Sequence, residues 1–223
     1  MTSIFERALG MNFRRLHSRL QERFGFSSAD GIACVGTGTM DTVWHGAGFT
    51  RPFLALGARR NILVRQTGQD ISFTIQNHAY RDSFGRETMA FTRTFHFDTP
   101  EHWDATMIHS VERDTIVDYL GTHQHIAVDL HASVDERGAL LIRSGEQRLH
   151  EGPLNARIPN LVTGTARLRE SYDERLGRFR IEVAVVNRWF GPLFGYRGTF
   201  TAVYPACDTV PTSAQPLREQ LRT

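Results

Sequence analysis

Two neighbouring stretches decide the fold of this chain: residues 70–80 read DISFTIQNHAY and residues 86–97 read RETMAFTRTFHF. In both stretches, apolar side chains occupy alternate positions. The alternating apolar residues are Ile71, Phe73, Ile75 and Ala79 in the first stretch, and Met89, Phe91, Phe95 and Phe97 in the second. A period of two is typical of a strand with one buried face. The short polar turn between them favours an antiparallel pairing, because parallel strands need a long crossover.

Similar strand patterns extend outward on both sides of this pair. The predicted strands are 62–65, 105–113, 114–120, 123–133, one opening at 140–142, 161–173, 178–187 and 193–204. Short polar turns join most of them, and a sheet this wide curls or closes because exposed edges are costly. We therefore predict a mainly β (α+β) fold: a strongly curved antiparallel meander sheet or barrel of about nine or ten strands. The pattern leaves open whether the sheet closes.

One amphipathic helix is predicted near the N-terminus, over residues 3–24. Ser3 and Glu6 have the spacing of a capping box, and Gly25 is a stop signal. The apolar stripe is formed by Phe13, Leu16, Leu20 and Phe24, and the opposite face carries Arg14, Arg15, Arg19 and Glu22. We expect the stripe to pack on the sheet with the arginines solvated; the alternative is a helix lying on a membrane surface.

The chain of 223 residues is predicted to hold one β-rich domain over residues 1–204, including the helix. Residues 205–223 contain Pro211 and Pro216 and few apolar side chains, so we expect a loose C-terminal tail.

Composition excludes several classes of function. All 26 basic residues are arginine, so neither a Schiff-base lysine nor a phosphate-loop lysine is present. The net charge of +2 does not favour a nucleic-acid partner, and no apolar run is long enough for a transmembrane segment. The arginines of the N-terminal helix would allow weak contact with a membrane surface. Two widely spaced cysteines fit a cytoplasmic protein.

A histidine-rich strand offers one candidate for metal chemistry. His123, His125, Asp129 and His131 share one strand face, and such side chains could hold a divalent metal. The plainer interpretation is a polar outer face, because Ile126, Val128 and Leu130 alternate with them. We predict no bound metal and no cofactor.

Arg93 is the second candidate, because it lies on the apolar face of the 86–97 strand. A guanidinium keeps its charge in proteins, and an unpaired buried charge is expensive. We expect Arg93 to pair with a carboxylate such as Glu112 or Glu170, to reach the rim, or to bind an anion inside an apolar pocket.

Several short segments resemble an uncharacterised bacterial domain family. The matching segments are Phe13-Arg14-Arg15-Leu16-His17, Gly36–Met40, Phe91-Thr92-Arg93-Thr94-Phe95, Gly177-Arg178-Phe179-Arg180-Ile181 and Phe194-Gly195-Tyr196-Arg197-Gly198. That family also occurs at the C-terminus of YndJ-type membrane proteins and behind saccharopine-dehydrogenase-like domains. The resemblance implies one domain that can stand alone, and it implies no activity.

The combined pattern favours a non-enzymatic binding module that holds a small apolar or acidic amphipathic molecule inside a curved sheet. The predicted ligand-binding residues are Arg93, Phe91, Phe95, Phe73, Met89 and Tyr196. The alternatives are an enzyme with a metal-assisted site at the histidines, or a protein-interaction domain that works with an oxidoreductase partner. No complete set of catalytic residues is visible, and nothing in the sequence predicts the oligomeric state.

Overall fold

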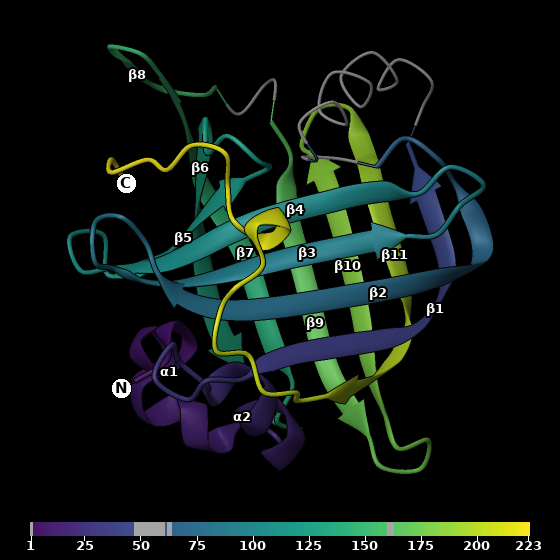
Figure 1. The fold of residues 1–223 in the computed structure, drawn as a ribbon. Coiled ribbons are helices and arrows are strands. Elements are labelled where there is room, and N and C mark those ends of the chain that lie inside the picture. The colour runs from purple at the N-terminus through teal and green to yellow at the C-terminus, as the bar shows by residue number, and fades with distance from the viewer. Residues whose placement is uncertain (1, 47–60, 62–63, 160–162) are drawn as a thin grey trace.

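The computed structural model, which describes residues 2–46, 61, 64–159 and 163–223, is built mainly of antiparallel strands (Figure 1). Within these residues, eleven strands form one sheet in the order β6-β5-β4-β3-β2-β1-β11-β10-β9-β7-β8. Because β6 also pairs with β7, ten strands close into a barrel, and β8 pairs with β7 alone. The predicted mainly β fold is confirmed, and the sheet closes.

The strands are β1 (Ala33–His45), β2 (Gly68–Arg81), β3 (Glu87–Phe95), β4 (Glu101–Ser110), β5 (Thr115–Leu120), β6 (Ile126–Val134), β7 (Leu140–Glu151), β8 (Leu154–Arg157), β9 (Thr165–Asp173), β10 (Arg178–Asn187) and β11 (Gly191–Val203). The strand predicted at 105–113 therefore begins earlier and ends at Ser110. For the strand predicted at 62–65, residues 62 and 63 lie outside the described residues, and residues 64 and 65 are not in a strand.

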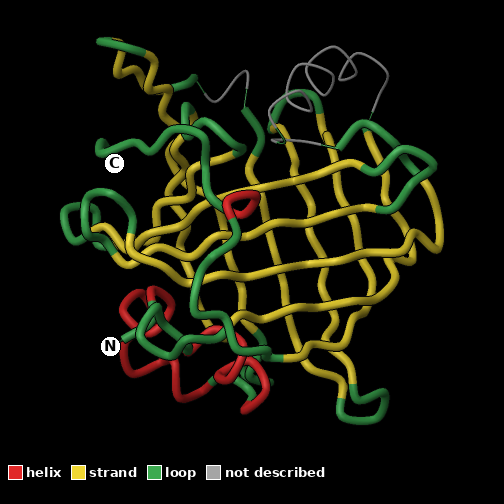
Figure 2. The backbone as a smooth tube through the Cα atoms, in the orientation of Figure 1, coloured by secondary structure: helices red, strands yellow, loops and turns green. Residues whose placement is uncertain are grey.

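The barrel has two walls whose strands cross steeply, with β2–β4 in one wall and β9–β11 in the other, and β1 curves from the first wall into the second (Figures 1 and 2). Aromatic rings from both walls meet between them. Phe95 of β3 lies with its ring centroid 5.1 Å from that of Tyr196 of β11, and both side chains are almost fully buried. The interior is thus lined with aromatic side chains from both walls, at the inward positions that the period of two predicted.

The N-terminal segment is divided, in contrast to the single helix predicted over 3–24. It contains α1 (Ile4–Leu9), a 3-10 helix η1 (Gly10–Arg15) and α2 (Ser18–Gly25). Gly10 ends α1 in a left-handed conformation (φ 52°), which glycine adopts without strain, and His17 caps the start of α2. The predicted capping box between Ser3 and Glu6 is present. Within the described residues, no helix is both long enough and apolar enough to cross a membrane.

These helices cover one end of the barrel. The ring of Phe5 contacts Phe91 of β3 at 6.2 Å between centroids and Phe24 of α2 at 4.6 Å. Ile4, Phe5, Leu9, Phe13, Leu16, Leu20 and Phe24 all join the main buried cluster. The expected packing of the apolar stripe on the sheet is therefore observed, although three short helices make the contact.

Residues 205–223 are not a loose tail but a strap bound to the outside of the barrel, and Figure 1 shows it crossing in front of β2–β4. The backbone N–H of Gln220 donates to Oε1 of Gln124 at 2.6 Å, and the Tyr119 hydroxyl donates to the carbonyl of Arg222 at 3.0 Å. A second buried cluster lies on the outward face of β4–β6, made of Ile108, Val117, Tyr119 and Ala127. The prediction failed because the strap binds through backbone groups, which its composition does not reveal.

Candidate functional site

Arg93 points into the barrel from β3, between Phe91 and Phe95 of the same inward row. Only 5% of its surface is exposed. Its guanidinium carbon lies 4.9 Å from the ring centroid of Trp103 on β4 and 5.3 Å from that of Phe91. Cation–π contacts of this kind stabilise a desolvated cation only partly. Arg93 therefore places a positive charge in the barrel interior, next to aromatic rings.

No carboxylate of the described residues forms an ion pair with Arg93. Its Nη1 donates to the backbone carbonyl of Trp103 at 3.4 Å, and its Nε has no partner in the described part of the chain. The predicted pairing with Glu112 or Glu170 is wrong. Glu112 is exposed in the turn between β4 and β5, and Glu170 pairs with Arg23 of α2.

Two more donors near Arg93 lack partners in the described part of the chain, namely Nε1 of Trp103 and the hydroxyl of Tyr196. The Trp103 and Tyr196 rings lie 5.7 Å apart between centroids, so all three groups surround one aromatic cluster. Burial raises the pKa of Tyr196 to about 12, and its hydroxyl therefore keeps its proton at neutral pH. Buried polar atoms normally have partners, so three unpaired donors in one place require an explanation.

A buried acid faces the same region from β5. Asp118 points inward beside Ile116, and its Oδ1 has no partner among the described residues. Burial raises its pKa to about 7, even though the nearby charge of Arg93 lowers it. The two groups do not reach ion-pair distance. Between their rows lies the small side chain of Ala105, which in β4 is flanked by Trp103 and Met107.

Together, Arg93, Trp103, Asp118 and Tyr196 form what we call the interior polar site. The structure also places Phe73, Phe91, Phe95 and Met89 on the inward faces of β2 and β3, as predicted, with 0–5% of their surface exposed. Asp118 and Trp103 were missed in the sequence. Trp103 falls outside the predicted strand, and Asp118 lies between Val117 and Tyr119, which hide the alternation.

A second interior charge, Arg23 of α2, was also missed. Its Nε donates to Oε1 of Glu170 at 2.5 Å, and its Nη1 donates to Oδ1 of Asn77 at 2.8 Å. Its guanidinium lies 4.9 Å from the ring centroid of Phe200. Burial opposes its charge, but the attraction of Glu170 outweighs burial and raises the pKa of Arg23. Its position three residues after Leu20, on the apolar stripe, is the signal that could have revealed it.

The histidine-rich strand does not form a metal site. Both oxygens of Asp129 accept from Arg113, at 2.8 and 2.7 Å, and Oδ1 also accepts from Arg148 at 2.7 Å. His125 Nδ1 lies 2.6 Å from a carboxylate oxygen of Glu151, while His131 is exposed. His123 stacks on His125 at 5.5 Å between ring centroids. In the part of the chain that the structure describes, no three histidine, cysteine or acidic side chains converge to hold a metal.

Comparison with known proteins gives a family and no activity. A family model described as a domain of unknown function (DUF4166) matches residues 16–200. The uncharacterised protein YndH of Bacillus subtilis (strain 168) is 35% identical over 203 residues, which cover 90% of this chain and 97% of that protein. No solved structure matches the chain.

Proposed function

The chain belongs to the DUF4166 family of domains of unknown function, and we propose that its barrel binds a small amphipathic acid. The head group would lie at the interior polar site, and the apolar body would lie among the surrounding rings. This proposal gives Arg93 and its neighbours the role of an anion receptor. It assigns no chemical reaction to the protein.

Arg93 is the strongest support for this proposal, because its guanidinium is buried and forms no ion pair with a carboxylate of the described residues. A guanidinium stays charged in proteins, and a charge left unpaired in an apolar interior costs several kcal/mol. A ligand carboxylate would accept hydrogen bonds from Nε of Arg93, Nε1 of Trp103 and the hydroxyl of Tyr196, each of which has no partner among the described residues. Charge-assisted hydrogen bonds of this type are the strong ones.

The surroundings support an apolar body on the ligand. The buried cluster that surrounds Arg93 is largely hydrophobic and includes Phe73, Phe91, Phe95, Met89, Ala105 and Phe194. Its interior polar groups are Asp118, Tyr196 and Glu170, which is paired with Arg23. A fatty-acid-like molecule would match both parts of the site, with its carboxylate at the polar groups and its chain among the apolar side chains. Specific sites are commonly apolar with a few fixed polar groups.

The proposal predicts that Arg93→Met removes binding without harming the fold. Titrating the wild type and the variant with dansylaminoundecanoic acid should show an affinity at least roughly tenfold weaker for the variant, since one charge-assisted hydrogen bond is worth about 1.5–3 kcal/mol. The ligand-free variant should be as stable as the wild type or more stable in urea unfolding, because no protein carboxylate loses its partner.

Two controls make this test decisive. Arg14→Met removes an exposed arginine of η1 and should leave probe binding unchanged. An uncharged alcohol with the same dansylated chain should bind the wild type and Arg93→Met alike. The proposal is wrong if both proteins bind the acid equally, or if Arg93→Met loses several kcal/mol of stability, because its partner would then belong to the protein.

A further inference from the structure

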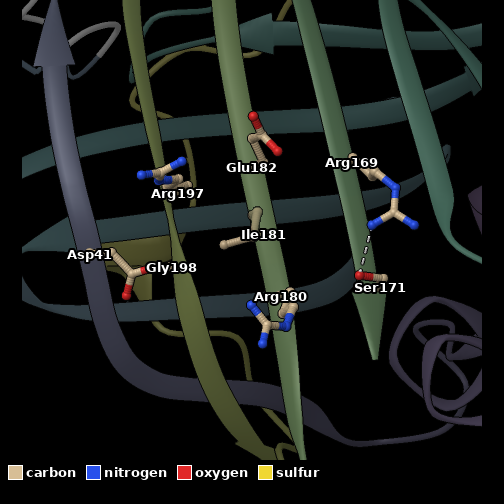
Figure 3. Close-up of a pocket in the computed structure, with 8 residues that line it drawn as sticks. All are labelled: Asp41, Arg169, Ser171, Arg180, Ile181, Glu182, Arg197 and Gly198. Carbon is tan, nitrogen blue, oxygen red and sulfur yellow. Dashed lines mark hydrogen bonds between the residues drawn. The ribbon is translucent and has the colours of Figure 1, made fainter. Parts of the chain in front are cut away.

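The outer surface of β7, β9, β10 and β11 carries two hollows that adjoin through Arg169 and Glu182. The larger, of about 390 Å³, is lined by His131, Ser133, Leu141, Ile142, Arg143, Arg167, Leu168, Arg169, Glu182 and Ala184. The smaller, of about 290 Å³, is lined by Asp41, Arg169, Ser171, Arg180, Ile181, Glu182, Arg197 and Gly198 (Figure 3). We call the two together the basic groove. It lies outside the barrel and shares no residue with the interior polar site.

At one register position of the basic groove, which we call a rung, three basic side chains from neighbouring strands lie side by side. In the strand register, Arg143 of β7 lies opposite both His131 of β6 and Arg167 of β9. Adjacent strands are about 4.8 Å apart, and like charges in directly opposed positions destabilise a sheet. All three side chains are exposed, and none has an ion pair or hydrogen bond in the described residues.

The acidic residues of this surface do not neutralise that rung. Arg169 pairs with Asp135 at 3.0 Å, and Arg180 pairs with Asp173 at 2.8 Å. In the neighbouring rung, Glu182 of β10 lies in register between Arg169 and Arg197, as Figure 3 shows. Two of the five groove arginines, Arg169 and Arg180, are thus neutralised by carboxylates just outside the groove. Arg143 and Arg167 form no ion pair within the described residues, so the unneutralised charge of the groove lies at these two side chains.

We propose that the basic groove binds a small anion with two or more negative charges, of the phosphoryl or sulfate type, at Arg143 and Arg167. The N–H groups of a guanidinium lie in one plane and donate paired hydrogen bonds that match such oxyanions. Because Arg143 and Arg167 lie on neighbouring strands, both can bind the same phosphoryl or sulfate group. Leu141 and Ala184 make part of the groove apolar, which suits an anionic group carried on an organic body. A soluble phosphate ester and an anionic lipid head group share this chemistry.

The test compares the wild type with Arg143→Gln/Arg167→Gln in calorimetric titration with inorganic tripolyphosphate, and in sedimentation with vesicles. The vesicles are phosphatidylcholine alone or phosphatidylcholine mixed with phosphatidic acid. We expect tripolyphosphate to bind the wild type and to bind the double variant at least roughly tenfold more weakly, which corresponds to the loss of one charge-assisted hydrogen bond. If the protein sediments only with vesicles that contain phosphatidic acid, and tripolyphosphate prevents this, the ligand is a lipid head group. If the protein binds tripolyphosphate but does not sediment with either kind of vesicle, the ligand is a soluble phosphate compound.

The matched control is Arg14→Gln/Arg175→Gln, which removes the same charge from two exposed sites outside the groove. It should bind tripolyphosphate like the wild type. The ligand-free groove variant should melt at the same temperature as the wild type or slightly higher, since like charges are removed. Equal binding by wild type and groove variant, or equal weakening in both double variants, would show that these arginines are merely solvated and would overturn the proposal.

Discussion

Replacing Arg23 with methionine should lower the free energy of unfolding by about 3–5 kcal/mol, the usual cost of removing one partner of a buried ion pair. The side chain of Arg23 is fully buried, and that of Glu170 is 2% exposed. Without the guanidinium, the Glu170 carboxylate would remain in an aromatic interior, and the carbonyl oxygen of the Asn77 side chain would lose its donor.

Urea unfolding of four variants separates the ion pair from simple packing. Glu170→Gln alone should also destabilise the protein, because Arg23 keeps its charge. The double variant Arg23→Met/Glu170→Gln should be clearly more stable than Arg23→Met, since both charges are then absent. Arg19→Met, which removes an exposed pair with Glu22 on the same helix, should cost less than about 1 kcal/mol. An Arg23→Met protein as stable as Arg19→Met would contradict the assigned role of the pair.

Asp118→Asn should stabilise the protein above neutral pH, by up to about 4 kcal/mol at pH 8. Burial raises the pKa of Asp118 from 3.8 to about 7, and each unit of pKa corresponds to about 1.4 kcal/mol. Between these two pKa values the folded state holds a proton that the unfolded state has released. Stability contributed by this group is therefore present at low pH and is lost as the pH rises from about 4 to about 7.

Urea unfolding at pH 5 and pH 8 measures this difference. The gain from Asp118→Asn should be roughly 2–3 kcal/mol larger at pH 8 than at pH 5, whereas Asp98→Asn, at an exposed position, should change neither value. The wild type should bind the acidic ligand more weakly at pH 8 than at pH 5, because an ionised Asp118 repels a carboxylate held by Arg93. Asp118→Asn should remove this difference. An Asp118→Asn protein that is less stable than the wild type at pH 8 would show that Asp118 is ionised and paired.

The alternation of apolar residues predicted most strands of the barrel, because a buried face leaves a period of two in the sequence. It failed where both faces of a strand are buried. In β5, Ile116 points inward while Val117 and Tyr119 point outward beneath the strap. The position of Asp118 could not be assigned from such a pattern. Closure was equally hidden, because it depends on the pairing of β6 with β7 and of β1 with β11.

The buried arginines show a second limit of prediction from the sequence. Arg93 was recognised because every neighbour on its strand face is apolar, but its lack of a carboxylate partner depends on where other strands place theirs. Glu170 was a reasonable candidate from its strand position, and it is taken by Arg23 from a helix 147 residues away in sequence. Such pairings are set by tertiary packing, and local sequence does not carry them.

The strap gives one part of the barrel wall a second buried layer that depends on strands formed earlier in folding. Gln220 and Arg222 hold the strap against the barrel through Gln124, in the turn between β5 and β6, and Tyr119 of β5. The outward cluster on β4–β6 is therefore covered only after these strands have paired, because the sheet positions the groups that the strap binds. Until the strap binds, the folding chain presents an apolar surface of the kind that chaperones bind and that leads to aggregation.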